Sequence, residues 1–211
     1  MVPWAEATAW LADQDAHMAA FVAYAGPCTL ARRRTDGGAF AALSRAILYQ
    51  QLATAAAATI HGRFAALYGG RPTPEAVAAT ADDVLRSAGV SAAKAAGVKD
   101  LAAKVLDGSL RLGGLGRLGD DEAVARLCAV RGIGPWTAEM FLMFQLNRPD
   151  VWPVGDLGVR TGYARIHGLA PPPDARALAA LGERYRPWRT VAAWYCWRAV
   201  DAGVSSPPEG W

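Results

Sequence analysis

The chain has 211 residues, 53% of them hydrophobic and 19% charged, with a formal net charge of +3. This composition supports a large apolar core and excludes a disordered chain, while the mild positive charge permits a polyanionic partner without indicating one. The start MVPWAEATAW lacks the features of a signal peptide, and no apolar stretch is long enough to cross a bilayer. We therefore expect a cytoplasmic protein with no membrane association.

Alanine-rich segments with helical periodicity follow one another along the chain, and no long alternation of β-branched and polar residues interrupts them. These features predict an all-α fold. In chain order, the apolar spacing and the capping residues predict helices over residues 4–24, 40–49, 54–68, 80–89, 91–107, 121–130, 136–146 and 156–167, with two further helices after residue 173.

Three connections between these helices carry information. Gln50 and Gln51 stand between two apolar helices, which is unusual for a plain core and fits a junction that presents its amides on the surface. Thr80 with Asp83 resembles a capping box at the start of a short helix. The glycine-rich stretch 110–122 is expected to be a loop, and because no strand precedes it, it is not a nucleotide-binding fingerprint.

The segment LCAVRGIGPWTAEM, residues 127–140, predicts a tight hairpin between two helices. Gly132 and Gly134 let the backbone turn sharply while Ile133 fills the gap, and Pro135 suits the first turn of the second helix. The amides around this turn then point outward at a helix N-terminus, which is a binding site for an anion such as a DNA phosphate. An ordinary turn between helices is the alternative that the hairpin alone leaves open.

Three motifs in fixed order, ILYQQLAT, then L-x-x-V-x-GIGPWTA, then DVWPVGDLGVR, resemble the helix-hairpin-helix (HhH-GPD) DNA glycosylase superfamily, most of all its 3-methyladenine DNA glycosylase II branch. The resemblance covers about residues 38–202. It implies a compact two-lobed helical fold with the active-site cleft between the lobes. One lobe is expected to contain about residues 1–38 and 156–211, and the other about residues 39–155, including the hairpin. The N-terminal β domain of some relatives is not expected, because the chain has no room for it.

The resemblance assigns the catalytic role to an aspartate. In this family, an aspartate beyond the hairpin starts a helix that faces the damaged nucleotide, and its charge stabilises the positive sugar that forms as the N-glycosidic bond breaks. The matching residue is Asp156. A helix N-cap is the alternative role for Asp156, and the two roles are compatible because helix-terminal amides keep a carboxylate ionised.

The resemblance also bears on the reaction type and the base pocket. Bifunctional relatives place a lysine just after the hairpin, where this chain has Trp136, so hydrolysis without strand cleavage is implied. Trp136 and Trp197 match aromatic residues of the pocket, and an indole face attracts cationic alkylated purines such as 3-methyladenine and 7-methylguanine. A place in the core is the alternative for both. Met140 stands where some relatives have a pocket aromatic, and Tyr195 is a further pocket candidate.

Contacts with DNA are implied at two places. At the glutamine junction the family inserts a side chain into the duplex to fill the hole that the flipped base leaves. The matching residue is Gln51, with Gln50 supporting the turn or touching the complementary strand, and a plain exposed amide pair is the alternative. The expected phosphate contacts at the hairpin are Gly132, Ile133, Gly134, Trp136 and Thr137.

Cofactors and partners follow from the same resemblance. The chemistry requires no metal or redox cofactor, although the hairpin has room for a structural monovalent cation. Cys28, Cys128 and Cys196 lie far apart and lack the spacing of a zinc or iron–sulfur site. The expected partner is double-stranded DNA that contains damaged bases, bound by a monomer.

The sequence leaves three other functions open. A glycosylase for another lesion, such as uracil, hypoxanthine or an oxidised purine, would use the same fold. A non-catalytic DNA-binding module would use the hairpin alone, but it would have no use for the carboxylate of Asp156. A helical protein-interaction domain would leave the hairpin, the glutamines and the aspartate unexplained.

Overall fold

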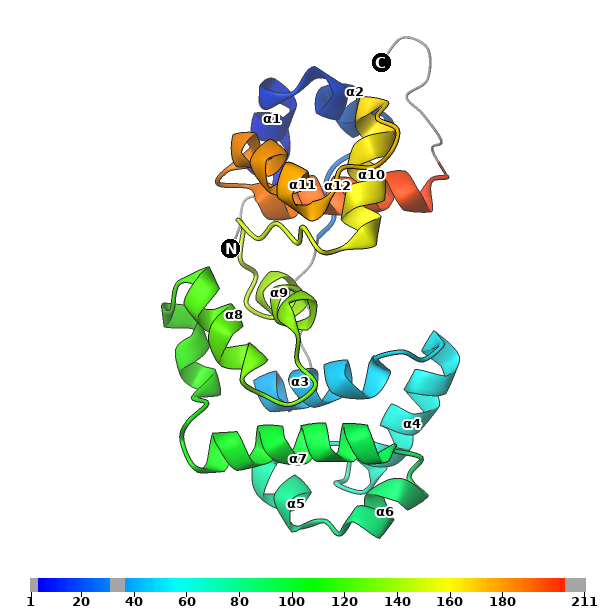
Figure 1. Cartoon of the computed structure of the whole chain (residues 1–211), viewed down its shortest axis with the longest axis vertical. Coiled ribbons are helices and arrows are strands. Elements are labelled where there is room, and N and C mark those ends of the chain that lie inside the picture. Colours follow the sequence, from blue (N-terminus) through cyan, green and yellow to red (C-terminus); the bar gives the residue numbers. More distant parts are fainter. Residues whose placement is uncertain (1–3, 31–36, 204–211) are drawn as a thin grey trace. The chain divides into compact units, whose positions relative to one another are not determined.

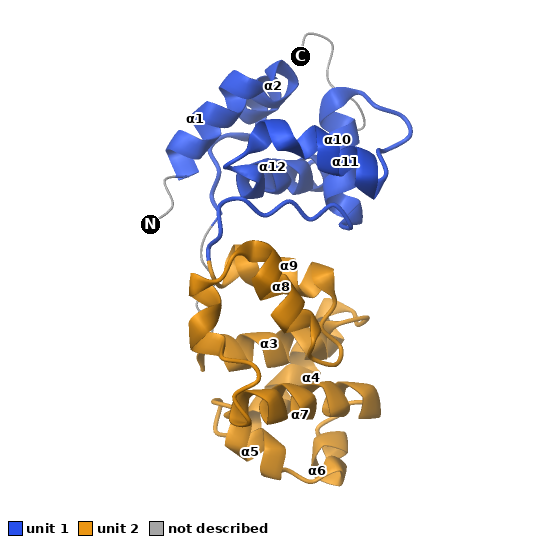
Figure 2. Ribbon diagram, turned by 60° about the vertical axis from the view of Figure 1, so that its left-hand side comes forward, with its two compact units in different colours: residues 1–32, 147–211 blue, residues 33–146 orange. Residues whose placement is uncertain are grey.

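The computed structural model describes residues 4–30 and 37–203, and all regular structure in these two ranges is helical (Figure 1), as the composition predicted. The chain divides into two compact units (Figure 2). Unit 1 contains residues 1–32 and 147–211, and unit 2 contains residues 33–146. Within the described ranges, no helix is both long and apolar enough to cross a membrane.

Unit 2 is a continuous stretch of chain built around two helices that lie side by side (Figure 1), α3 (Gly38–Tyr49) and α7 (Ala92–Leu106). Ile47 of α3 and Leu101 of α7 are buried in its core. Its other described elements are α4 (Thr54–Ala66), α5 (Pro74–Ala79), α6 (Asp82–Ser87), the 3-10 helix η1 (Leu112–Arg117), α8 (Asp120–Cys128) and α9 (Pro135–Phe144).

Unit 1 is formed by both ends of the chain. Its described elements are α1 (Trp4–Gln14), α2 (Ala16–Ala25), α10 (Leu157–His167), α11 (Ala175–Gly182), the 3-10 helix η2 (Glu183–Tyr185) and α12 (Arg189–Asp201). Helices α10 and α12 pack so closely that a Cβ atom at Gly162 would lie 1.9 Å from the backbone oxygen of Cys196. Their approach therefore requires glycine at position 162.

The boundary between unit 2 and the second part of unit 1 lies between Leu146 and Asn147, whereas the resemblance implied a boundary at 155–156. Residues 147–155 belong with unit 1 because this segment is bound to the start of α12. Arg189 donates hydrogen bonds to both carboxylate oxygens of Asp150, at 2.7 and 3.0 Å. The crossing from unit 1 into unit 2 lies outside the described residues.

The single helix expected over residues 4–24 is two helices, because Asp15 interrupts it. Asp15 is extended, with φ −154° and ψ 115°, and its carboxylate caps α2 by accepting hydrogen bonds from two amides of the first turn at 3.0 and 3.1 Å. The same carboxylate accepts a hydrogen bond from the Tyr185 hydroxyl at 2.7 Å and lies 2.9 Å from Nε2 of His167. These partners are distant in sequence, so local periodicity did not reveal the break.

Two other local predictions were wrong. Thr80 ends α5 instead of opening a helix: its hydroxyl donates to the carbonyl oxygen of Ala76 at 2.7 Å, and α6 begins at Asp82 without a side-chain cap. The stretch 110–122, expected to be a loop, contains η1, whose Leu115 is buried.

Candidate functional site

The predicted hairpin is present in unit 2, between α8 and α9. Gly132 has a φ of +84°, a conformation that favours glycine, and Pro135 is the first residue of α9. Ile133 fills the turn as predicted, with only 4% of its surface exposed. The hairpin is therefore set by the two features that the sequence displayed, a left-handed glycine and a buried apolar plug.

The amides at the start of α9 suit an anion. The first hydrogen bond of the helix runs from the amide of Ala138 to the carbonyl oxygen of Gly134 at 3.0 Å, so the amides of Trp136 and Thr137 come before the intrahelical pattern begins. Ile133 differs, because its amide donates to the carbonyl oxygen of Val130 at 3.0 Å. The expectation that the Ile133 amide binds phosphate is not supported, and its contribution is the buried side chain.

The glutamine junction between α3 and α4 is bound to the hairpin. Nε2 of Gln50 donates to the carbonyl oxygen of Gly132 at 2.8 Å and to the hydroxyl of Thr137 at 3.2 Å. Gln51 is exposed and has a φ of +56°, which costs a non-glycine residue about 1 kcal/mol or more. The junction thus holds one glutamine against the hairpin and presents the other to solvent.

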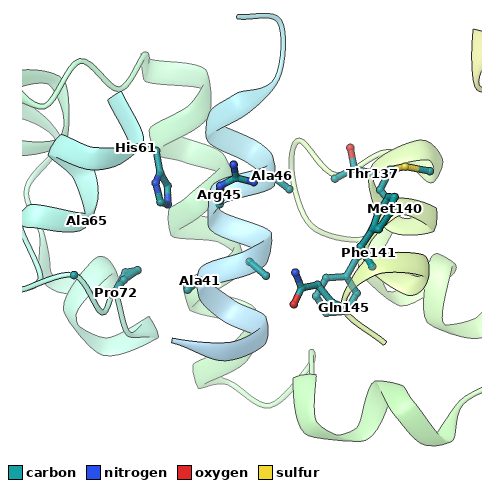
Figure 3. A pocket seen from close by; sticks show the side chains of 13 residues that line it. Ala41, Arg45, Ala46, His61, Ala65, Pro72, Thr137, Met140, Phe141 and Gln145 are labelled. Carbon is teal, nitrogen blue, oxygen red and sulfur yellow. The ribbon is translucent and has the colours of Figure 1, made fainter. Parts of the chain in front are cut away.

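Unit 2 also contains a pocket of about 630 Å³ on the surface of α3, between α4 and α9 (Figure 3). Its lining is mostly apolar, with alanines of α3 on its floor, and Met140 and Thr137 of α9 contribute one side. Arg45 and His61 lie on α3 and α4, and burial together with the Arg45 charge lowers the pKa of His61. Trp136 does not line this pocket and is 49% exposed.

Asp156 in unit 1 begins α10 and is 9% exposed. Its Oδ1 atom accepts a hydrogen bond from the amide of Val159 at 2.8 Å, so it is the N-cap that the sequence predicted. The same oxygen accepts a hydrogen bond from the indole Nε1 of Trp197 on α12 at 3.0 Å. Two donors and its place at a helix N-terminus therefore fix an aspartate that is largely removed from solvent.

Two glycines of α10, which were not predicted as site residues, allow this arrangement. A Cβ atom at Gly158 would lie 2.9 Å from Cδ1 of Trp197 and 3.0 Å from Oδ1 of Asp156. Gly162, one turn later, lies against the backbone of Cys196. Two glycines four residues apart inside a helix are a recognisable signal of close helix packing, and in this structure both lie against α12, the helix that carries Trp197.

Tyr195 is not a pocket residue. It is fully buried in unit 1, and its hydroxyl donates to the carbonyl oxygen of Gly26 at 2.9 Å and to the hydroxyl of Thr8 at 3.5 Å. Its ring packs edge-on against Phe21 of α2. The prediction for Tyr195 was therefore wrong: the side chain joins α12 to the N-terminal helices.

The remaining predicted site residues divide between the units. Unit 2 contains the junction, the hairpin, Trp136 and Met140, and unit 1 contains Asp156 and the half-buried Trp197. Among the described residues, no group of three or more His, Cys, Asp or Glu side chains is arranged to hold a metal ion.

Comparison with known proteins places this geometry in a family. Residues 44–187 match the model of the HhH-GPD superfamily base excision DNA repair proteins. The chain is 38% identical over 169 residues to DNA-3-methyladenine glycosylase 1 of Schizosaccharomyces pombe, a match that covers 79% of this chain and 74% of the relative.

Two solved structures are similar over nearly the whole chain. The 3-methyladenine DNA glycosylase Mag1 of Schizosaccharomyces pombe, in complex with abasic DNA, aligns with a TM-score of 0.79 and 32% identity, covering 97% of this chain and all of that one (100%). A DNA-3-methyladenine glycosidase of Bacillus halodurans aligns with a TM-score of 0.86 and 33% identity, covering 95% of this chain and 92% of that one. The chain belongs to the HhH-GPD superfamily of base excision DNA repair proteins, in the branch that contains the DNA-3-methyladenine glycosylases.

Proposed function

We propose that this protein is a monofunctional DNA glycosylase that removes alkylated purines from double-stranded DNA and leaves an abasic site. It acts as a monomer in the cytoplasm. The observation that carries the proposal is the setting of Asp156, a helix N-cap carboxylate that is 9% exposed and bonded to the indole of Trp197 at 3.0 Å. The names of the relatives support the substrate class.

Asp156 supplies the charge that the reaction needs. As the N-glycosidic bond breaks, positive charge builds on the sugar, and a fixed carboxylate beside it lowers the energy of that transition state. The hydrogen bonds from Val159 and Trp197 hold the carboxylate in place, so it does not reorganise while the charge develops. The same carboxylate orients the attacking water.

The hairpin and the junction bind the DNA. The amides of Gly134, Trp136 and Thr137 at the start of α9 donate hydrogen bonds to a phosphate, and the exposed side chain of Gln51 enters the duplex where the base has left. A structural monovalent cation at the hairpin belongs to the same proposal. Backbone carbonyl oxygens of the turn are suitable ligands for such an ion, and no chemical step requires the ion.

The aromatic residues favour a cationic substrate. An indole face attracts a desolvated cation by about 1–2 kcal/mol, and alkylation at N3 or N7 gives a purine a positive charge and a weaker glycosidic bond. Trp136 and Trp197 are the proposed base contacts, and Met140 is the third. Because Trp136 replaces the lysine of bifunctional relatives, the reaction ends at the abasic site without cutting the strand.

The test is release of free base from methylated duplex DNA, measured for the wild type and for Asp156→Asn. Asparagine keeps the helix cap and removes the charge, so we expect the variant to fold and bind DNA while its single-turnover rate falls by about a hundred-fold or more. The matched control is Asp174→Asn, because Asp174 caps α11 in the same way, accepting from the amide of Ala177 at 2.8 Å.

The outcomes separate the alternatives. An Asp156→Asn rate within ten-fold of the wild-type rate would contradict the catalytic assignment. Release of uracil or hypoxanthine, with no release of 3-methyladenine or 7-methylguanine, would contradict the proposed substrate class but not the proposed mechanism. If the wild type binds DNA but releases no base from any of these duplexes, the alternative of a non-catalytic DNA-binding module would be favoured. Strand cleavage before alkali treatment would contradict the monofunctional reaction.

A further inference from the structure

Helix α7 contacts both parts of unit 2 that are proposed to bind DNA. At its start, the ammonium group of Lys94 donates a hydrogen bond to the carbonyl oxygen of Leu48 at 2.7 Å. Leu48 lies in the last turn of α3, two residues before Gln50, and helix C-terminal carbonyls attract a positive charge. Lys94 is half-buried, and burial lowers the pKa of its ammonium group, so the contact is made despite a cost in desolvation.

One turn further along α7, Gly97 lies between α3 and the hairpin. A Cβ atom at Gly97 would be 2.9 Å from the carbonyl oxygen of Arg131 and 3.2 Å from Cγ2 of Ile47. Arg131 directly precedes Gly132, and Ile47 belongs to the last turns of α3. The absence of a side chain at this point lets both elements rest on the same turn of α7.

After one more turn, Asp100 binds the hairpin itself. Its Oδ2 atom accepts a hydrogen bond from the backbone amide of Arg131 at 2.8 Å, and its Oδ1 atom accepts one from Lys104 at 2.6 Å. Burial alone would raise the pKa of Asp100, but these two hydrogen bonds lower it below its usual value. The carboxylate thus remains charged at neutral pH, with one oxygen committed to the hairpin backbone.

We infer that α7 sets the spacing between the glutamine junction (residues 50–53) and the hairpin (residues 131–134), with Lys94 and Asp100 as positioning residues for base flipping. Each residue bonds a backbone group at the edge of the element that it holds, and neither contacts DNA in this role. The hydrogen bond from Gln50 to Gly132 closes the connection between the two elements. The inference rests on the proposed function, since it concerns how the DNA contacts are held.

This role has a specific consequence. If the junction and the hairpin lose their spacing, the base leaves the stack less often, but the bond cleavage at Asp156 is unchanged once the base is out. A lesion that is already unpaired needs less energy to flip. The defect of a positioning variant should therefore depend on whether the lesion is paired, whereas general damage to the fold lowers both rates alike.

The test compares two duplexes, one with 7-methylguanine opposite cytosine and one with 7-methylguanine opposite an abasic-site analogue. We expect Lys94→Met and Asp100→Ala to lower single-turnover base release about ten-fold on the paired duplex, as for one lost hydrogen bond to a charged group, and less than about two-fold on the unpaired one. Lys94→Arg restores a donor and should recover most of the rate. The matched control is Lys99→Met, because Lys99 lies on the same helix but pairs with Asp82 of α6. Equal losses on both duplexes, or no loss on either, would overturn the inference.

Amide hydrogen exchange of the free protein tests the same spacing without catalysis. Lys94→Met should speed exchange in the junction, Asp100→Ala should speed it in the hairpin, and Lys99→Met should change neither. Unchanged exchange in both variants would overturn the inference even if the wild type is active. A wild type that releases no base from either duplex, and no 3-methyladenine from methylated duplex DNA, would instead contradict the proposed function, and the exchange result would still decide the role of α7.

Discussion

Replacing Gly162 by alanine should strongly destabilise unit 1. The added Cβ atom would lie 1.9 Å from the carbonyl oxygen and 2.4 Å from the carbonyl carbon of Cys196, where ordinary contacts begin at 3.4 Å. Helices α10 and α12 must therefore separate by about 1.5 Å, because both clashing atoms belong to the backbone and no rotamer change relieves them. Overpacking of this kind costs about 1–3 kcal/mol or more, and we expect a net loss of about 3 kcal/mol in the free energy of unfolding.

The assay is thermal and urea unfolding followed by circular dichroism. A loss of about 3 kcal/mol corresponds to a fall of roughly 6–12 °C in Tm for a chain of this size. The control is the same substitution at Gly62, inside α4, where a Cβ atom would have no neighbour within 4 Å. Gly62→Ala should raise the free energy of unfolding by up to about 1 kcal/mol through helix propensity alone. If the free energy of unfolding of Gly162→Ala lies within about 1 kcal/mol of the wild-type value, the helices are not in backbone contact and the reasoning is refuted.

Two further predictions concern titration and catalysis. The pKa of Asp15 is far below its ordinary value. Burial alone would raise this pKa, but the hydrogen bonds from His167 and Tyr185 lower it by more than burial raises it. The unfolded chain therefore takes up the proton at a higher pH than the folded chain, so the stability that Asp15 contributes is complete above about pH 5 and is lost as the pH falls through about 4 toward the folded pKa. Urea unfolding from pH 3 to 7 should give a shallower pH dependence for Asp15→Asn and a loss of about 3 kcal/mol at pH 7, and parallel curves for wild type and variant would contradict this. Trp197→Phe removes the indole donor to Asp156 and should lower the single-turnover rate about ten-fold with little change in Tm, whereas an unchanged rate would mean that this hydrogen bond does not position the carboxylate.

The parts of the site that the sequence predicted are local in the chain. Gly132, Ile133 and Pro135 form the hairpin through the conformations that their own side chains allow. Asp156 caps α10 by a bond to an amide three residues later. Such features depend on neighbouring residues, so spacing and residue type predict them.

The parts that could not be predicted depend on partners far along the chain. Asp15 looked like one more polar residue on a helix because His167 and Tyr185 lie about 150 positions or more away. Tyr195 resembled a pocket aromatic, but Thr8 and Gly26 hold it in the core. The contacts of α7 were equally hidden, since the backbone partners of Lys94 and Asp100 lie 46 and 31 positions away along the chain.

The division of unit 1 between the two ends of the chain has a consequence for biosynthesis. On the ribosome, α1 and α2 emerge first, but their partners α10 and α12 are translated last, after the whole of unit 2. At about 5–20 residues per second, the N-terminal helices wait roughly ten seconds or longer with the apolar side chains of Leu11, Met18 and Phe21 uncovered. Unit 2 is continuous and can complete its fold in that interval. Nascent chains arrested before α12 should therefore bind holdase chaperones through their first 25 residues, and release them when the C-terminal helix leaves the exit tunnel.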